Sequence, residues 1–366
     1  MSGGAPKSRF ATRACLAVLV MSFLAALPAS AGARVVISDG EARLALDPSL
    51  VRDLRREGVE AAGIEPGTAK GRAIELPVVA GATNGSPGRG ALTVAGGFSF
   101  QGGGRVARFT DLLLNTGKGQ STAKIAGKRR ILARHGALES SPEGFGARIR
   151  IRHLRLTGGT AAALNRKLGL EGVFQAGRRL GSLAIVAIPA TVPIAFGSIA
   201  IGGPETTFSK LESRQVQMGI WGASERWTAP GETYFLFQVK PTTVPPDASA
   251  GILEGDPNDG ISMEIHAPPP RNMLLRGPRI DLASGELSAT VSALSAADPV
   301  TATIATLDYS GAIFQVRPRV GAFELMGIRA VATQFVADQL NARFETPGLF
   351  QAGETLARIA VTLHAR

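Results

Sequence analysis

Hydrophobic and polar residues alternate along most of this chain. Leu287, Ala289 and Val291 occupy every second position of one such run, with polar or small neighbours between them. Clusters of Gly, Pro, Asn, Asp and Ser separate the runs. A period of two is typical of a β-strand with one buried face. The pattern predicts an all-β protein built mainly from antiparallel strands.

The alternation changes phase once in residues 148–156. Ile149 and Ile151 alternate with arginines, and the next apolar position is Leu154 rather than residue 153. One extra residue in a strand produces a β-bulge, which re-aims the residues that follow. We therefore expect a bulge near His153.

A few segments carry helix signals instead. Asp47-Pro48-Ser49 combines a capping residue with a proline in the first turn, and Gly58 is a stop signal. Thr157 and Thr333 are expected N-caps of two further short helices.

The chain also contains an internal repeat. Leu164-Asn165 and Phe174-Gln175-Ala176-Gly177 recur as Leu340-Asn341 and Phe350-Gln351-Ala352-Gly353, at a constant offset of 176 positions. A weaker match joins residues 119–125 to residues 285–291. Two tandem modules are expected, at 32–190 and 191–366, each a β-sandwich or flattened barrel with one short helix near its C-terminal end. The apolar stretch from Val192 to Ile201 is expected to be a strand that connects them.

Residues 1–31 have the features of an export signal. Three cations precede an apolar run from Ala14 to Leu27, and Ala29-Ser30-Ala31 offers a small-residue cleavage site. The run is short for a membrane span, which needs roughly 20 apolar residues. We expect a mature chain that begins near Gly32 and is secreted, with cell-surface association as an open alternative.

Composition and motifs exclude several kinds of chemistry. The only cysteine, Cys15, lies in the expected signal, so the mature chain has no thiol for disulfides, metal ligation or nucleophilic attack. The sequence contains no serine elbow and no His-Glu-x-x-His motif, and its four histidines are scattered. We therefore expect no enzyme, no catalytic residue and no protein-ligated metal ion.

The net charge is +11, and it falls to +8 once the three signal cations are removed. A basic exported protein suits anionic partners, among them wall polymers, a membrane surface or a carboxylate-bearing ligand. The stripe of Arg148, Arg150 and Arg152 could pair with such a partner or form a solvated sheet face. Aromatic residues make up 5% of the chain, which argues against nucleic acid as the partner.

Motifs in both halves resemble a known family, the Htaa domain. In the second half these are Trp221-Gly222 with Trp227 six positions after the first tryptophan, the glycine-started run from Gly260 to His266, and the segment from Gly277 to Leu282. The first half is similar to a divergent single-repeat form in its segments 46–48, 96–100 and 164–165. Together these segments lie across most of the mature chain.

Htaa domains are secreted haem-binding modules of Gram-positive iron-uptake proteins, in which a tyrosine binds the iron and a histidine supports it. The resemblance places His266 at the histidine position. The family's tyrosine position, three residues after Trp227, holds Pro230, which leaves Tyr234 and Tyr309 as the candidate tyrosines. The first half offers glycines at 102–104 where the histidine would be.

The resemblance therefore implies that the second module binds haem, or another small apolar anionic ligand, through His266 with Tyr234 or Tyr309. The alternative is a non-enzymatic structural or adhesive protein of the cell envelope that uses the same scaffold without a haem ligand.

Overall fold

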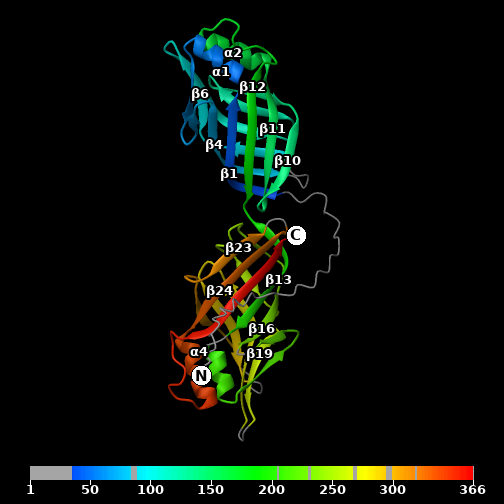
Figure 1. The fold of residues 1–366 in the computed structure, drawn as a ribbon, viewed down its shortest axis with the longest axis vertical. Coiled ribbons are helices and arrows are strands. Elements are labelled where there is room, and N and C mark those ends of the chain that lie inside the picture. Colours follow the sequence, from blue (N-terminus) through cyan, green and yellow to red (C-terminus); the bar gives the residue numbers. More distant parts are fainter. Residues whose placement is uncertain are drawn as a thin grey trace, which may run out of the picture. The chain divides into compact units, whose positions relative to one another are not determined.

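The computed structural model describes residues 35–83, 89–203, 206–229, 232–266, 270–293, 299–317 and 320–365. Its strands form two antiparallel sheets, of 12 and 13 strands, with four helices beside them (Figure 1). The expected all-β, mainly antiparallel architecture is confirmed. No helix within these ranges is long and apolar enough to cross a membrane.

The first sheet takes its strands from the first half of the chain. They are β1 (Val35–Leu46), β2 (Glu60–Ile64), β3 (Thr68–Lys70), β4 (Ala73–Thr83), β5 (Gly90–Val94), β6 (Gly97–Gly102), β7 (Arg105–Asn115), β8 (Gln120–Ile125), β9 (Lys128–His135), β10 (Leu138–Glu143), β11 (Gly146–Leu156) and β12 (Arg179–Pro189). Its helices are α1 (Pro48–Arg56) and α2 (Gly158–Leu168). Both helices lie at one end of the sheet (Figure 1).

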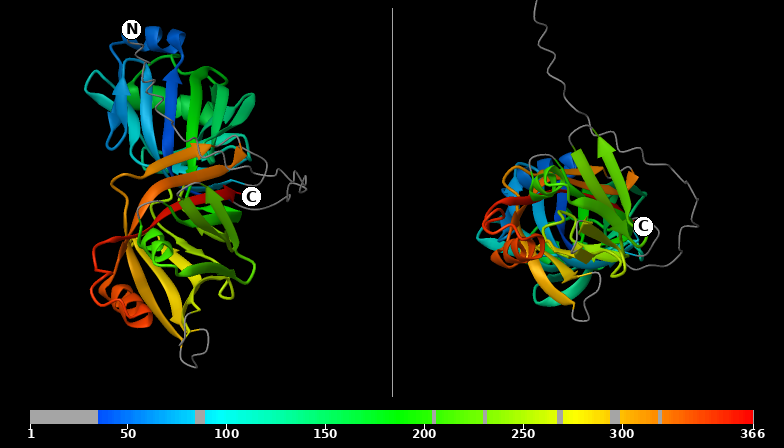
Figure 2. Two further views of the ribbon diagram at one scale, coloured as in Figure 1. Left: turned by 60° about the horizontal axis from the view of Figure 1, so that its bottom comes forward. Right: turned by 90° about the horizontal axis from the view of Figure 1, so that it is seen from below.

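The second sheet begins with the next strand. Its members are β13 (Val192–Gly202), β14 (Gln217–Trp221), β15 (Glu225–Ala229), β16 (Glu232–Val239), β17 (Thr242–Val244), β18 (Ile252–Glu254), β19 (Gly260–Ile265), β20 (Arg271–Asp281), β21 (Glu286–Ser292), β22 (Val300–Asp308), β23 (Ile313–Arg317), β24 (Ala322–Ala332) and β25 (Thr355–Ala365). Its helices are α3 (Thr207–Ser213) and α4 (Gln334–Phe344), and α4 covers one end of the sheet (Figure 2).

Each sheet curls into a barrel. In the first, β7 pairs with both β5 and β8, so the path through β5, β4, β1, β12, β11, β9 and β8 returns to β7. In the second, β18 pairs with β20. The Lys240 amide, just after β16, donates to the carbonyl of Glu254 on β18 at 2.9 Å, so β18 links β20 to the end of β16. A barrel of about eight strands has an interior that side chains fill.

The repeat of the sequence is a repeat of the structure. The bounds of α4 and β25 are those of α2 and β12 shifted by 176 positions. Thr157 and Thr333 each cap their helix, accepting from the amide three residues later. Phe174 and Phe350, 2% and 3% exposed, lie in the two cores. The weaker match is also structural, because β8 and β21 hold the same position between their neighbours in the two sheets.

Several local expectations are met and others are corrected. The register of β11 shifts between Ile151 and Leu154, which is the bulge expected near His153. The helix expected after Asp47 is α1, with Asp47 as its N-cap. The second module has one helix more than expected, because α3 follows β13. The segment from Val192 is a strand in the middle of the second sheet, between β25 and β16.

Candidate ligand-binding site in the second module

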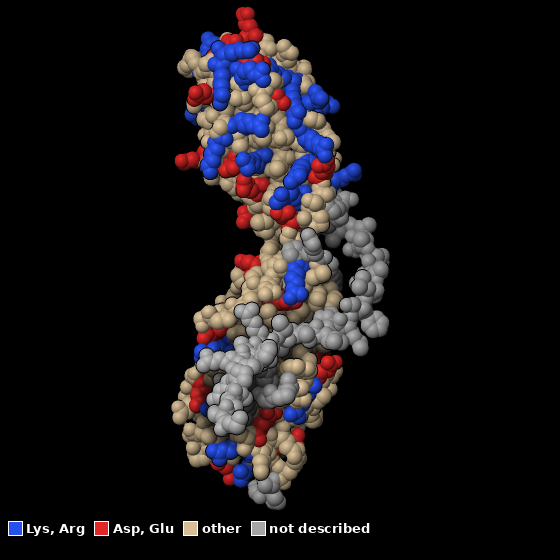
Figure 3. Space-filling view, viewed as in Figure 1, with Lys and Arg blue, Asp and Glu red and all other residues tan. Residues whose placement is uncertain are grey.

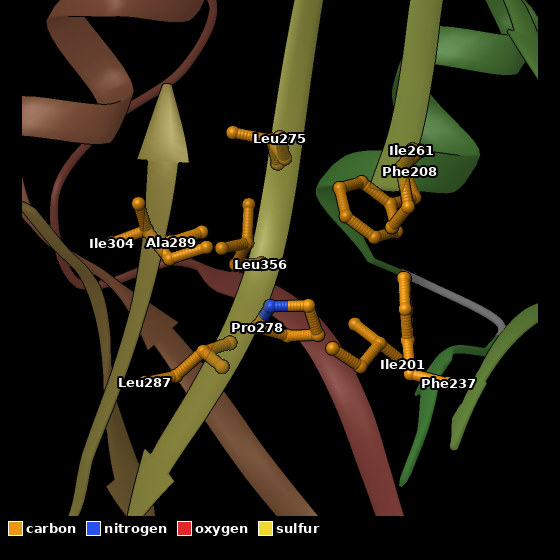
Figure 4. Close-up of a pocket in the computed structure, with 10 residues that line it drawn as sticks. All are labelled: Ile201, Phe208, Phe237, Ile261, Leu275, Pro278, Leu287, Ala289, Ile304 and Leu356. Atoms are coloured by element: carbon orange, nitrogen blue, oxygen red, sulfur yellow. The ribbon is translucent and has the colours of Figure 1, made fainter. Parts of the chain in front are cut away.

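The interior of the second barrel has little free space. Ten apolar side chains from β13, β16, β19, β20 and their neighbours line a cavity of about 20 Å³ (Figure 4). A similar cavity of about 20 Å³ lies in the first barrel. Pockets for drug-sized ligands and cofactors have volumes of roughly 300–1,000 Å³. Neither of these two cavities can hold a porphyrin.

One row of residues on the second sheet combines aromatic and cationic side chains. Trp227 on β15 pairs with Tyr234 on β16, Tyr234 pairs with Gly202 on β13, and Gly202 pairs with Arg358 on β25. We call Trp227, Tyr234, Gly202 and Arg358 the aromatic–arginine row. Directly paired residues of neighbouring strands point to the same face of a sheet. The row therefore presents its side chains on one face.

The aromatic half of the row is a partly exposed platform. The rings of Trp227 and Tyr234 are 5.7 Å apart and tilted by 41°, and Trp227 is 44% exposed. Tryptophan and tyrosine offer a large apolar area with one polar atom. Such a pair can contact the face of a flat ligand with its apolar area.

Glycine occupies the centre of the row because no side chain fits there. A Cβ atom at Gly202 would lie 2.0 Å from the Thr233 carbonyl oxygen. At the next residue, Gly203, a Cβ would lie 3.0 Å from the Tyr234 hydroxyl and 3.3 Å from the Arg358 Cβ. The hydroxyl of Tyr234 and the stem of Arg358 therefore lie over the same glycine.

Arg358 supplies positive charge and an unused donor. Its Nε is buried and has no hydrogen-bond partner within the described part of the chain. A buried donor without an acceptor costs about 1–3 kcal/mol. Its neighbour across the ladder, Arg329, is 3.7 Å from Asp308. An anion beside Tyr234 would lie next to the Arg358 guanidinium and compensate its charge.

His266 lies elsewhere on this module. It follows the last residue of β19, is exposed, and its Nε2 is 3.0 Å from the Gln217 side-chain oxygen. The two ends of the strand order are β14, which is next to β19, and β15, which is next to β16. These two strands approach each other where the Arg226 side chain donates to the Met218 carbonyl at 2.7 Å. His266 thus has Gln217 as a partner, and the role of His266 stays a prediction.

Tyr309 is half-buried. It follows the last residue of β22 and packs against the core. Its hydroxyl is buried and has no hydrogen-bond partner among the described residues. Burial raises the pKa of Tyr309, and the nearby charge of Asp281 raises it further. The phenolate that ferric iron prefers is therefore disfavoured at this position. Pro230 lies outside the described residues.

The first module lacks this row at the same place in its sheet. There Lys70 pairs with Ala73, Ala73 with Ala45, and Ala45 with Ser182. The repeat offset of 176 relates Ser182 to Arg358. The first module thus has neither the aromatic pair nor the arginine. Sequence reasoning missed Arg358, although comparing the two copies residue by residue would have revealed the difference from Ser182.

Among known proteins, this chain is similar to solved structures only at the level of the fold. No family model and no curated protein matches the chain. Among solved structures, the C-terminal domain of HtaA from Corynebacterium glutamicum is similar at 13% identity and a TM-score of 0.34, covering 42% of this chain and 98% of that domain.

The haem-binding protein HtaB of the same organism is similar at 15% identity and a TM-score of 0.30, covering 48% of this chain and 96% of HtaB. The N-terminal domain of HtaA is similar at 14% identity and a TM-score of 0.32, covering 47% of this chain and 98% of that domain. These domains belong to the family that the sequence motifs resemble. At this identity and TM-score, the similarity transfers no residue role and no ligand to this chain.

Proposed function

We propose that this chain is an exported, non-enzymatic binding protein that holds haem, or a similar flat anion, on the aromatic–arginine row of its second module. The observation that carries the proposal is the placement of the Tyr234 hydroxyl and the Arg358 stem over Gly203, beside the exposed ring of Trp227. The Htaa-like motifs of the sequence support haem as the ligand, and the export signal supports a site of action at the cell surface.

The residues of the row fit the chemistry of such a ligand. A phenolate is a hard anionic ligand suited to ferric iron, which gives Tyr234 the role of iron ligand. Trp227 would pack against the porphyrin, and Arg358 would pair with a propionate by charge-assisted hydrogen bonds. Haem would supply its iron, its porphyrin face and a propionate to these contacts. The small size of the two cavities in the barrels supports a ligand position on the sheet.

Hemin titration of the mature protein, followed by the Soret band, tests the proposal. We expect one saturable site with a shifted band, lost in Tyr234→Phe and weakened in Arg358→Gln. Tyr309→Phe and Arg279→Gln are the controls, because Tyr309 lies in the core and Arg279 pairs with Glu254. Equal spectra for the wild type and Tyr234→Phe would contradict the proposal.

One observation favours the alternative function, a structural or adhesive envelope protein. All five residues of β23 are exposed, including Ile313 and Phe314, and the strand pairs only with β24 among the described strands. An exposed apolar edge strand can pair with a strand of another chain. If hemin gives no saturable Soret change, this edge becomes the stronger candidate for the protein's contacts.

A further inference from the structure

The two modules differ sharply in charge. Residues 32–190 contain 24 Lys and Arg against 12 Asp and Glu, a net charge of +12. Residues 191–366 contain 13 against 17, a net charge of −4. The basic character of the mature chain therefore belongs to its first module. Figure 3 shows Lys and Arg gathered over the face of this module that carries β1, β12 and β11.

Three arginines on this sheet stand directly beside one another. Arg179 on β12 pairs with Arg155 on β11, and Arg155 pairs with Arg134 on β9. We call these three residues the arginine row. Paired positions on antiparallel strands place Cβ atoms roughly 5 Å apart, and like charges in such pairs are destabilising. All three side chains are exposed, so burial does not explain the arrangement.

The protein itself compensates the row only in part. Arg179 is 3.3 Å from Asp47 and donates to the Arg152 carbonyl at 3.0 Å. Arg155 donates to the Gly177 carbonyl at 3.2 Å, which holds its side chain in place without a counter-charge. Within the described residues, no ion pair joins Arg134 or Arg155 to a carboxylate. The row is therefore held in position with most of its charge unused.

The second module provides the same backbone positions without the charge. There Thr355 on β25 pairs with Val331 on β24, and Val331 pairs with Thr306 on β22. The repeat offset relates Arg179 to Thr355. The fold therefore accommodates uncharged residues along this row, and the three arginines are not needed to build the barrel.

We propose that the arginine row of the first module is a docking surface for a linear phosphate polymer. Arg150 and Arg152 lie farther along β11, and Arg152 is paired with Glu139. Arginines therefore recur at roughly 5 Å across the strands and roughly 7 Å along them, and Arg150 adds a cation that forms no ion pair among the described residues. A chain that carries one anion after another can contact several of these cations at once. This surface is independent of the ligand proposed for the second module.

Phosphate fits the row better than carboxylate does. A guanidinium fork donates two parallel hydrogen bonds, which occupy both oxygens of a planar carboxylate. An internal phosphate of a linear polymer is tetrahedral, and its two non-bridging oxygens point out of the plane of the chain in different directions, so arginines from neighbouring strands can share one group. The segments of β9, β11 and β12 contain no Phe, Tyr or Trp, hence no platform for stacking nucleic-acid bases and no aromatic anchor for a membrane interface.

The test measures binding of long-chain inorganic polyphosphate to the mature protein as a function of salt. The row variant replaces Arg134 by Thr, Arg155 by Val and Arg179 by Thr, the residues of the second module. A second variant, Arg134→Gln with Arg155→Gln, keeps the Arg179 contact with Asp47. The charge-matched control, Arg52→Gln with Arg55→Gln and Arg166→Gln, removes three exposed cations from α1 and α2.

We expect the row variant to lose about tenfold or more in affinity and its salt slope to fall by about 2, since each phosphate contact contributes roughly 0.7–0.9 to that slope. The double variant should lose part of this affinity, and the control should change little. Equal losses in the row variant and the control would overturn the proposal, because net charge alone would then explain the binding.

Three further probes distinguish the polymer from other anions. Poly-glutamate, single-stranded DNA and phosphatidylglycerol vesicles are titrated under the same conditions. Weaker binding of poly-glutamate and of the vesicles than of polyphosphate supports the proposal. Single-stranded DNA is itself a linear phosphate polymer, so it should also bind through the row. Poly-glutamate or vesicles that bind as tightly as polyphosphate, with an equal dependence on the row, would overturn the assignment to a phosphate polymer.

Discussion

Asn341 connects α4 to the loop that follows this helix, and replacing Asn341 should destabilise the second module. Its side-chain Nδ2 donates to the Phe350 carbonyl at 2.7 Å, and its Oδ1 accepts from the Phe350 amide at 3.0 Å. The Phe350 side chain is 3% exposed. In Asn341→Ala both bonds are lost, and the peptide groups of Phe350 are left without this partner.

The expected cost follows from these two bonds. Each contributes about 1 kcal/mol net, and a peptide group left unpaired in a buried place costs about 1–3 kcal/mol. We therefore expect Asn341→Ala to lower the free energy of unfolding by about 2–4 kcal/mol. Asn341→Asp keeps the acceptor but turns a carboxylate oxygen toward the Phe350 carbonyl. It should cost a similar amount at neutral pH and less in acid.

Urea denaturation followed by tryptophan fluorescence is the assay. Both tryptophans, Trp221 and Trp227, belong to the second module, so their emission reports its unfolding. Gln351→Ala, an exposed neighbour, is the control and should change the free energy of unfolding by less than about 0.5 kcal/mol. A change in Asn341→Ala as small as that of the control would refute the reasoning.

Three further predictions follow from particular contacts. Phe174→Ala and Phe350→Ala should each cost about 3–5 kcal/mol in unfolding experiments, because both side chains are buried; a loss under about 1 kcal/mol in either would contradict this. Burial lowers the pKa of His135 from 6.5 to about 4. The unfolded chain therefore binds the proton more readily, and stability should fall by about 1–2 kcal/mol as the pH drops from 6.5 to 4, after allowance for partial exposure. His135→Gln should show a smaller fall over this range, and an identical profile would exclude His135 as the cause. N-terminal sequencing of the exported product should begin near Gly32; an intact residue 1–31 segment would make it an anchor.

Local patterns in the sequence predicted local structure well. The N-caps at Thr157 and Thr333 depend on residues within one helical turn, and the bulge near His153 depends on a phase slip inside one strand. The repeat predicted that Phe174 and Phe350 would share an environment, and each is bonded through its backbone to an asparagine nine residues earlier. These features need no knowledge of which strands are neighbours.

The candidate site was less predictable because it depends on strand register. Trp227 and Tyr234 lie on consecutive strands of one hairpin, close in sequence. Gly202 and Arg358 join them only through the pairing of β13 with β16 and β25. Register is a property of the whole sheet, since a slip of one residue turns every side chain to the other face. For the same reason the sequence could not separate Tyr234, which is in the row, from Tyr309, which lies against the core.

The most direct test of the account is a crystal structure of the mature protein with bound hemin. The account predicts one porphyrin on the second module, over Gly202 and Gly203, with its iron bonded to the Tyr234 oxygen and a propionate on Arg358. A porphyrin ordered on the first module, or one whose iron is bound by His266 away from the aromatic–arginine row, would contradict it.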